Sequence, residues 1–327
     1  LAAVGEAHSA FNSALILQAN GINARFVDLS GWKSMENHDL DSAIVSAFEG
    51  MDFAHEMPIV TGYVKCDQGI MKTFDRGYSE ITFSKLAVLT HAREGVIHKE
   101  FHLSTGDPKL IGEDKVEVIG NTNFDIADQL SDMGMEAIHP KAAKQMEGQN
   151  IPIRVKNAFD PEHPGTLISR DYISPVPRVE MICGRNDIIA IEVHDPKMVG
   201  ESGYDYHLTE CLKNHHISYI AKTTNANTIT HFVPERNKTL EACLADIRRK
   251  FPESKVETCK IGIISVIGTN MRVPGFLTRA AKTLFDAGIN VLALDQTMRQ
   301  VNIQFMLNRD DFKNAQIVLH REFVEKN

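Results

Sequence analysis

Hydrophobic and polar residues alternate along the first half of the chain with two different periods. Some stretches repeat their apolar residues every three or four positions, as amphipathic helices do, and shorter apolar runs between them are typical of buried strands. Strands that alternate with helices predict a largely parallel sheet covered on both faces, whose ligands bind where strands end and helices begin. The predicted helices are Ala7–Gln18, Leu40–Glu49, Glu80–Arg93, Thr122–Met133 and one beginning at His139, and the predicted strands are Ile22–Leu29, Pro58–Val60, Val96–Ile97, Ile151–Val155 and Thr166–Ile168.

The second half of the chain is an internal repeat that follows a linker, Tyr172–Pro177. Each copy reads strand, glycine turn, helix, strand, strand, helix, which is the split β-α-β order of a ferredoxin-like module. Repeats of this kind indicate two modules of the same fold. The copies are offset by 72 residues at three matching pairs, Gly203 and Gly275, Ile217 and Ile289, and Ile229 and Val301.

One copy of the repeat lacks its closing strand. The first copy ends with a strand at Val256–Cys259, whereas the second stops after a helix around Asp311–Phe323. An open sheet edge would expose unpaired backbone groups. The strand Val179–Cys183 has no place in the first copy, so we expect it to fill this edge.

Composition narrows the class of protein. The chain has 327 residues, 43% of them apolar and 24% charged, with a net charge of -8, which argues against nucleic acid as the main partner. Five scattered cysteines form no C-x-x-C pair, which fits a reducing cytoplasm. No apolar run approaches the roughly 18 residues that span a bilayer, so no membrane partner is expected. The start at Leu1 suggests that the natural N-terminus lies upstream.

The stretch Thr73–Thr82, T-F-D-R-G-Y-S-E-I-T, is the first candidate site. Ser79 is expected to cap the following helix, and Arg76 would lie beside the free N–H groups of its first turn. A guanidinium, a hydroxyl and a helix N-terminus together form a receptor for a carboxylate or phosphate. From this segment alone, a capped helix with a surface arginine is the favoured interpretation.

A metal site at His98 and His102 is a competing interpretation of the middle segment. Histidines four residues apart share one face of a helix. However, I-H-K-E-F-H-L alternates as a strand does, and the H-E-x-x-H spacing is absent. We therefore predict no metal ligands in the chain.

Motifs along nearly the whole chain resemble those of aspartate kinases, with an amino-acid-kinase domain followed by two ACT modules. They include G-E-A-H-S-A, P-I-V-T-G-Y, R-G-Y-S-E, G-D-P-K, G-M-E-A-I-H-P, I-P-I-R-V-K-N-A-F-D-P-E-H-P-G-T-L-I and G-T-N-M-R-V-P-G-F. R-G-Y-S-E and H-K-E-F-H-L-S look most like the branch associated with ectoine synthesis. The resemblance implies an α/β, carbamate-kinase-like domain at 1–172, a first ACT domain at 173–259 and a second at 260–327, completed by strand 178–183.

The resemblance implies Mg²⁺- and ATP-dependent phosphorylation of the β-carboxylate of L-aspartate to 4-phospho-L-aspartate. Glu6 would bind the substrate ammonium group, and Arg76 and Ser79 would hold its carboxylates, with Arg76 as the catalytic residue. This chemistry requires that the two anionic substrates, aspartate and ATP, are held in line and that their negative charge is neutralised.

The nucleotide half departs from the family pattern. His98-Lys99 replaces a Thr-Asp pair, Ser104 replaces a tyrosine, Lys109 replaces an arginine and Glu136 replaces a lysine. These changes leave the nucleotide preference open. The expected nucleotide contacts are Lys99, Ser104 and Lys109. A lysine, however, offers phosphate a single point charge, whereas the guanidinium of an arginine offers two parallel N–H donors.

A Lys-x-Gly-Gly-Thr segment, which opens the family pattern, has no counterpart before Gly5. We therefore expect an N-terminally truncated kinase domain that is inactive when assayed alone. The alternative is a non-catalytic, amino-acid-binding ACT fragment with a kinase remnant.

The glycine turns of the repeat are the expected effector sites. Gly200 and Gly203 in one copy, and Gly275 in the other, precede a helix N-terminus. Edge-to-edge pairing of the sheets predicts a homodimer or a dimer of dimers. The family resemblance makes lysine and threonine the first effectors to test. Because the first turn, M-V-G-E-S-G-Y, is altered, loss of feedback control is an equal expectation.

Overall fold

The computed structural model describes residues 2–31, 39–67, 69–70, 77–135 and 138–326. The chain forms two compact units. One contains Leu1–Phe101 and Ala137–Tyr172, and the other contains His102–Glu136 and Ile173–Asn327. None of the helices in the described part of the chain has the length and apolar character needed to cross a bilayer.

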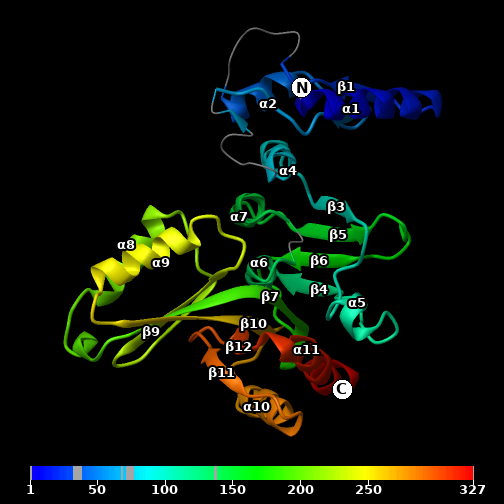
Figure 1. Ribbon diagram of the computed structural model, residues 1–327. Coiled ribbons are helices and arrows are strands. Elements are labelled where there is room, and N and C mark those ends of the chain that lie inside the picture. The colour runs from blue at the N-terminus through cyan, green and yellow to red at the C-terminus, as the bar shows by residue number, and fades with distance from the viewer. Residues whose placement is uncertain (1, 32–38, 68, 71–76, 136–137, 327) are drawn as a thin grey trace. The chain divides into compact units, whose positions relative to one another are not determined.

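The first unit is built from short parallel strands and the helices between them (Figure 1). Strand β1 pairs in parallel with β2, and β3 pairs in parallel with β5, which pairs in antiparallel with β6. The predicted alternation is therefore present, with boundaries shifted by a few residues. The elements are α1 (Ala2–Ala19), β1 (Ala24–Val27), α2 (Leu40–Phe48), β2 (Met57–Val60), α4 (Tyr78–Leu89), β3 (Gly95–Lys99), α7 (Pro140–Gly148), β5 (Ile153–Asn157) and β6 (Thr166–Ser169).

The second unit contains a six-stranded sheet in the order β11-β12-β10-β7-β9-β8. The strands are β7 (Arg178–His194), β8 (Ala221–Thr224), β9 (Thr228–Pro234), β10 (Lys255–Thr269), β11 (Val291–Asp295) and β12 (Asn302–Asn308). The helices are α5 (Pro108–Ile111), α6 (Phe124–Asp132), which follows the short strand β4 (Asn121–Asn123), η2 (Pro196–Met198), α8 (Tyr204–Asn214), α9 (Leu240–Lys250), α10 (Phe276–Asp286), η3 (Arg309–Asp311), α11 (Phe312–His320) and η4 (Arg321–Glu325).

Two long strands, β7 and β10, pass through both repeat copies (Figure 1). The C-terminal part of β7 pairs with the start of β10, and Val256 lies opposite Val193. The N-terminal part of β7 pairs with the end of β10, where Cys183 lies opposite Ser265 and Val179 opposite Gly268. Val179–Cys183 thus occupies the sheet edge for which the sequence predicts it, and the strand predicted at Val256–Cys259 continues to Thr269.

A bulge lies where the two strands pass from one module to the other. The pairing register shifts between Ile261 and Ile263, and a Cβ on Gly184 would lie 2.1 Å from the carbonyl oxygen of Ile263. Glycine is therefore required at 184 because the two backbones approach too closely for any side chain.

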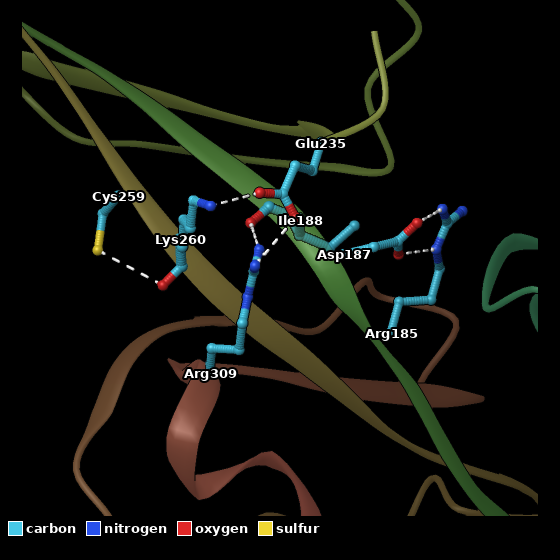
Figure 2. A network of polar contacts seen from close by, with 7 residues as sticks. All are labelled: Arg185, Asp187, Ile188, Glu235, Cys259, Lys260 and Arg309. Atoms are coloured by element: carbon cyan, nitrogen blue, oxygen red, sulfur yellow. Dashed lines mark hydrogen bonds and ion pairs between the residues drawn. The ribbon is translucent and has the colours of Figure 1, made fainter.

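Polar contacts tie the strands together beside this bulge (Figure 2). The Glu235 carboxylate accepts hydrogen bonds from Lys260 Nζ at 2.7 Å and Arg309 at 2.9 Å. Arg309 also donates to the carbonyl of Ile188 at 3.0 Å. These contacts join η3 of the second module to β7, to β10 and to the residue that follows β9.

Residues 102–136 pack with the ACT-like unit, although the sequence predicts them as part of the first domain. They pack there because apolar side chains of this segment are buried against the six-stranded sheet. Leu103, Ile119, Ile126 and Leu130 are buried in one hydrophobic cluster with sheet residues such as Met181. The other cores of this unit lie under α8 and α9 and under α10 and α11.

Candidate functional site

A carboxylate of α1 and the first turn of α4 form the polar centre of the first unit. Glu6 Oε1 accepts hydrogen bonds from the Ser79 hydroxyl at 2.8 Å and from the Tyr78 hydroxyl at 2.9 Å. The ring of Tyr63 packs edge-on against that of Tyr78, with centroids 6.0 Å apart. Burial raises the pKa of Tyr78, and the hydrogen bond to Glu6 raises it further, so the phenol remains a donor.

The other carboxylate oxygen, Glu6 Oε2, is buried and has no hydrogen-bond partner within the part of the chain that the structure describes. A buried acceptor that lacks a donor costs roughly 1–3 kcal/mol, and more when it is charged. Buried polar groups in folded proteins are nearly always paired. This oxygen is therefore the feature of the site that most favours a ligand with a donor group.

Gly62, two residues after the end of β2, lies close to the Glu6–Ser79 pair. A Cβ at this position would lie 2.8 Å from Ser79 Oγ and 2.9 Å from Glu6 Oε2. The Thr82 hydroxyl donates to the Gly62 carbonyl at 2.6 Å, which holds the turn against α4. Since β1 and β2 are parallel, the site lies at the carboxyl end of these strands, as expected for an α/β sheet.

The predicted capping role of Ser79 is wrong. Helix α4 begins two residues earlier than predicted, at Tyr78 rather than Glu80, with Gly77 at its N-cap and no side chain bonded to the cap. Ser79 therefore lies in the first turn, where its hydroxyl is directed to Glu6 instead. Glu6 itself lies within α1, which starts at Ala2 rather than Ala7.

The neighbouring residues of R-G-Y-S-E also have specific contacts. A Cβ on Gly77 would lie 2.3 Å from the ring of His139, the N-cap of α7. Glu80 accepts the backbone N–H of His139 and forms an ion pair with Lys99 at 3.2 Å. Arg76, the predicted catalytic residue, lies outside the described residues.

The three predicted nucleotide contacts are divided between the two units. Lys99 ends β3 in the first unit, where it is paired with Glu80. Ser104 and Lys109 belong to the second unit. The Ser104 hydroxyl is buried and donates to the carbonyl of Gly106 at 2.9 Å, whereas Lys109 is exposed on α5. Ser104 therefore has a structural role in the turn before α5.

The predicted effector glycines adopt backbone conformations that favour glycine. The φ angles are 83° at Gly200, 83° at Gly203 and 115° at Gly275. Gly203 is the N-cap of α8 and Gly275 is the N-cap of α10. All three are exposed, and a Cβ would meet open space at each, so φ alone explains the glycine.

Two participants in the site escaped prediction, Tyr78 and Gly62. Tyr78 is adjacent to Ser79 in R-G-Y-S-E, but nothing in the sequence indicates that its hydroxyl reaches a residue 72 positions away. Gly62 lies in the P-I-V-T-G-Y segment, and a glycine shortly after a predicted strand can indicate that another part of the chain approaches the backbone closely.

No cluster of three His, Cys, Asp or Glu side chains suited to a metal ion occurs among residues 2–31, 39–67, 69–70, 77–135 and 138–326.

Comparisons with known proteins give the family context. Residues 1–157 match the model of the amino acid kinase family, and residues 264–323 match an ACT domain model. The chain is 47% identical over 325 residues to aspartate kinase Ask_Ect of Stutzerimonas stutzeri (strain A1501), covering 99% of this chain and 68% of that one. It is 24% identical over 285 residues to chloroplastic aspartokinase 1 of Arabidopsis thaliana, covering 84% of this chain and half of the plant protein.

Solved structures confirm the predicted fold, a kinase-type α/β domain followed by ACT modules. The crystal structure of Clostridium acetobutylicum aspartate kinase superposes with a TM-score of 0.81 at 19% identity, covering 97% of this chain and 74% of that one. Escherichia coli aspartokinase III in complex with aspartate and ADP gives a TM-score of 0.76, also at 19% identity, with the same coverage.

Proposed function

The chain belongs to the aspartate kinase family, and from that premise we propose that it serves the ATP-dependent phosphorylation of the β-carboxylate of L-aspartate to 4-phospho-L-aspartate. The observation that carries this proposal is Glu6, whose Oε2 is buried without a donor while Ser79 and Tyr78 hold Oε1. The relative of known structure that was crystallised with aspartate and ADP supports the same pair of ligands.

Glu6 would accept the ammonium group of L-aspartate at Oε2. A charge-assisted hydrogen bond of this kind is about twice as strong as a neutral one. Because Oε2 is not exposed to solvent, the ammonium group reaches it only when the surrounding side chains shift. Ser79 and Tyr78 would keep the carboxylate oriented during that change.

Arg76 would bind a carboxylate of the substrate through its two-pronged guanidinium. The hydroxyl of Ser79 has a single proton, which it gives to Glu6. Ser79 could hold a substrate carboxylate only by exchanging that bond. We therefore propose that Ser79 chiefly positions Glu6.

Phosphoryl transfer to a carboxylate needs little covalent help from the protein, since the attacking oxygen belongs to the substrate. What the protein supplies is alignment of two anions and neutralisation of the charge on the transferred group. Lys99, Ser104 and Lys109 are the proposed nucleotide contacts. Lys99 would have to exchange Glu80 for phosphate, and the Ser104 hydroxyl would have to exchange its bond to the Gly106 carbonyl. Mg²⁺ would arrive with ATP and shield its phosphate charge.

Replacing Glu6 tests the proposal. Succinate has both carboxylates of aspartate but no ammonium group, so the preference for aspartate over succinate isolates the proposed contact. We expect Glu6→Gln to reduce this preference at least tenfold in titration calorimetry, and the exposed Glu162→Gln to leave it unchanged. An undiminished preference in Glu6→Gln would remove the basis of the assignment.

Regulation is proposed through the glycine turns and the sheet edges. Strands β8 and β11 are the outer strands of the six-stranded sheet, and each offers backbone groups for pairing with a second chain. A homodimer or dimer of dimers would bring together turns containing Gly200, Gly203 and Gly275, where lysine or threonine would bind. Sedimentation with and without each amino acid tests both the proposed assembly and the proposed binding of lysine or threonine. A strict monomer at tens of micromolar would contradict the proposed assembly.

The proposed setting is the cytoplasm, since all five cysteines are unpaired. The product would feed either ectoine synthesis or the aspartate family of amino acids. The high identity to Ask_Ect makes the first route the one to test, by following ectoine in cells that lack the gene.

A further inference from the structure

A cavity of about 410 Å³ lies inside the second unit, away from Glu6 and its partners. One side is formed by the segment from Thr105 to Gly120, and another by the start of β7. The remaining wall comes from α10 and η4. The residues that matter for its chemistry are Thr105, Glu117, Arg178, Phe276, Arg279 and Phe323.

The guanidinium of Arg178 donates no hydrogen bond to any of the described residues, and its Nε is buried without an acceptor among them. Its nearest charged neighbour is Glu180, whose carboxylate is 3.8 Å from the guanidinium, beyond hydrogen-bond distance. The side chain of Arg178 is 40% exposed, so its outer N–H groups are open to the cavity. An arginine held at a cavity wall with free N–H groups favours an oxyanion.

Glu180 is already satisfied by other donors. Thr122 donates to one of its oxygens, and Thr269 donates to the other at 2.8 Å. Burial raises the pKa of this carboxyl, with the threonines and Arg178 acting in the opposite sense. Glu180 is therefore held mainly by the two threonines, and its link to Arg178 is the longer ion pair at 3.8 Å.

The second arginine of the cavity has its partners within the protein. Arg279 donates to Glu322 Oε1 at 3.2 Å, and its guanidinium lies 4.7 Å from the centre of the Phe323 ring. Phe323 in turn stacks on Phe276, with 6.0 Å between ring centroids. Phe276 and Phe323 therefore form an aromatic wall of the cavity that Arg178 also lines. Glu117 is the exposed carboxylate at the rim.

We propose that this cavity binds a small carboxylate with an apolar body, its carboxylate on Arg178 and its apolar part against Phe276 and Phe323. The volume lies within the usual range of about 300–1,000 Å³ for small-molecule sites, and the mixture of apolar walls with one fixed polar anchor is typical of them. The site shares no residue with the proposed aspartate site. The inference therefore stands independently of the proposed function.

The test uses 4-methylpentanoate and its neutral analogue 4-methylpentanamide, titrated into the protein while methyl and aromatic NMR signals are followed. The two probes differ only in charge and donor capacity. We expect the carboxylate to bind at least tenfold more tightly than the amide, with shifts centred on Phe276, Phe323 and Val324. L-leucine forms a third arm, because a gain over 4-methylpentanoate would mean that Glu117 adds an ammonium contact.

Arg178→Gln should remove the preference for the carboxylate, because the glutamine side chain is polar but uncharged and is too short to place a donor where the guanidinium lies. The exposed Arg248→Gln on α9 is the matched control and should keep that preference. Thermal unfolding of each variant verifies that the unit remains folded. Equal binding of acid and amide to the wild type, shifts elsewhere in the protein, or no binding by either probe would overturn the proposal.

Discussion

Thr105 and His320 lie 215 residues apart in the chain, yet Thr105 Oγ1 and His320 Nε2 are 3.0 Å apart in a buried hydrogen bond. The other ring nitrogen of His320 is 3.1 Å from Glu325, which can only accept as a carboxylate. In the neutral tautomer that satisfies both contacts, the proton lies on Nδ1 and the Thr105 hydroxyl donates to Nε2. The segment with Ser104 and Lys109 is thereby fastened to the last helices of the second ACT module.

We expect His320→Phe and Thr105→Val each to lower the free energy of unfolding by about 1–3 kcal/mol, because each leaves one buried partner unpaired. The double variant should cost less than the sum by about 1 kcal/mol. Urea unfolding of the four proteins measures this coupling. Strictly additive losses would show that the bond contributes nothing of its own.

If Ser104 and Lys109 contact the nucleotide, His320→Phe should also raise the KM for ATP while leaving the KM for aspartate unchanged. A loss of stability alone would not separate the two constants in this way.

Gly62→Ala should weaken aspartate binding at least tenfold. The added methyl group would lie under 3 Å from both Ser79 Oγ and Glu6 Oε2, so the pair must separate. Gly148→Ala is the matched control, since a Cβ there meets nothing within 4 Å. Titration calorimetry with L-aspartate measures the effect, and unaltered affinity in Gly62→Ala would mean that the pair lies outside the substrate site.

Arg76→Ala should reduce kcat/KM for aspartate by roughly 100-fold or more, through loss of a bidentate carboxylate contact. The expected loss is larger than that from Arg76→Lys, because lysine retains the positive charge but lacks the two parallel N–H donors of the guanidinium. Steady-state kinetics of the whole protein provide the measurement. Kinetics equal to those of the wild type would exclude Arg76 from substrate recognition.

His231 should make the protein less stable in mild acid. Burial lowers its pKa from 6.5 to about 4, with Asp205 opposing this shift and Lys222 reinforcing it. The unfolded chain takes up a proton near pH 6.5 and the folded chain only near pH 4. Stability is therefore complete above pH 6.5 and falls, by up to about 3 kcal/mol, as the pH drops toward 4.

His231→Phe keeps a ring beside Tyr219, whose centroid is 5.2 Å from that of His231, and removes the titration. The free energy of unfolding of the variant should change less between pH 7 and pH 5 than that of the wild type. Parallel curves would assign the acid sensitivity to other groups.

The sequence predicted what depends on local pattern, and missed what depends on distant packing. The 72-residue repeat and the order of strands and helices identified both ACT modules, because periodicity and glycine turns are local signals. By contrast, Ser79 has the residue type of a cap, and only the approach of α1 shows that its hydroxyl serves Glu6. In the same way, Thr122 looks like the start of a helix but lies in β4 and donates to buried Glu180.

The two continuous strands, β7 and β10, have a consequence for how the protein folds. Each ACT module needs a part of both strands, so no single cut in the backbone yields two complete modules. A second module released by a cut after Cys259 would lose the N-terminal part of β7 and expose the edge of β10 that pairs with it. We therefore expect the pair to unfold in one cooperative step, and the chain to behave during evolution as a unit whose halves are inherited together.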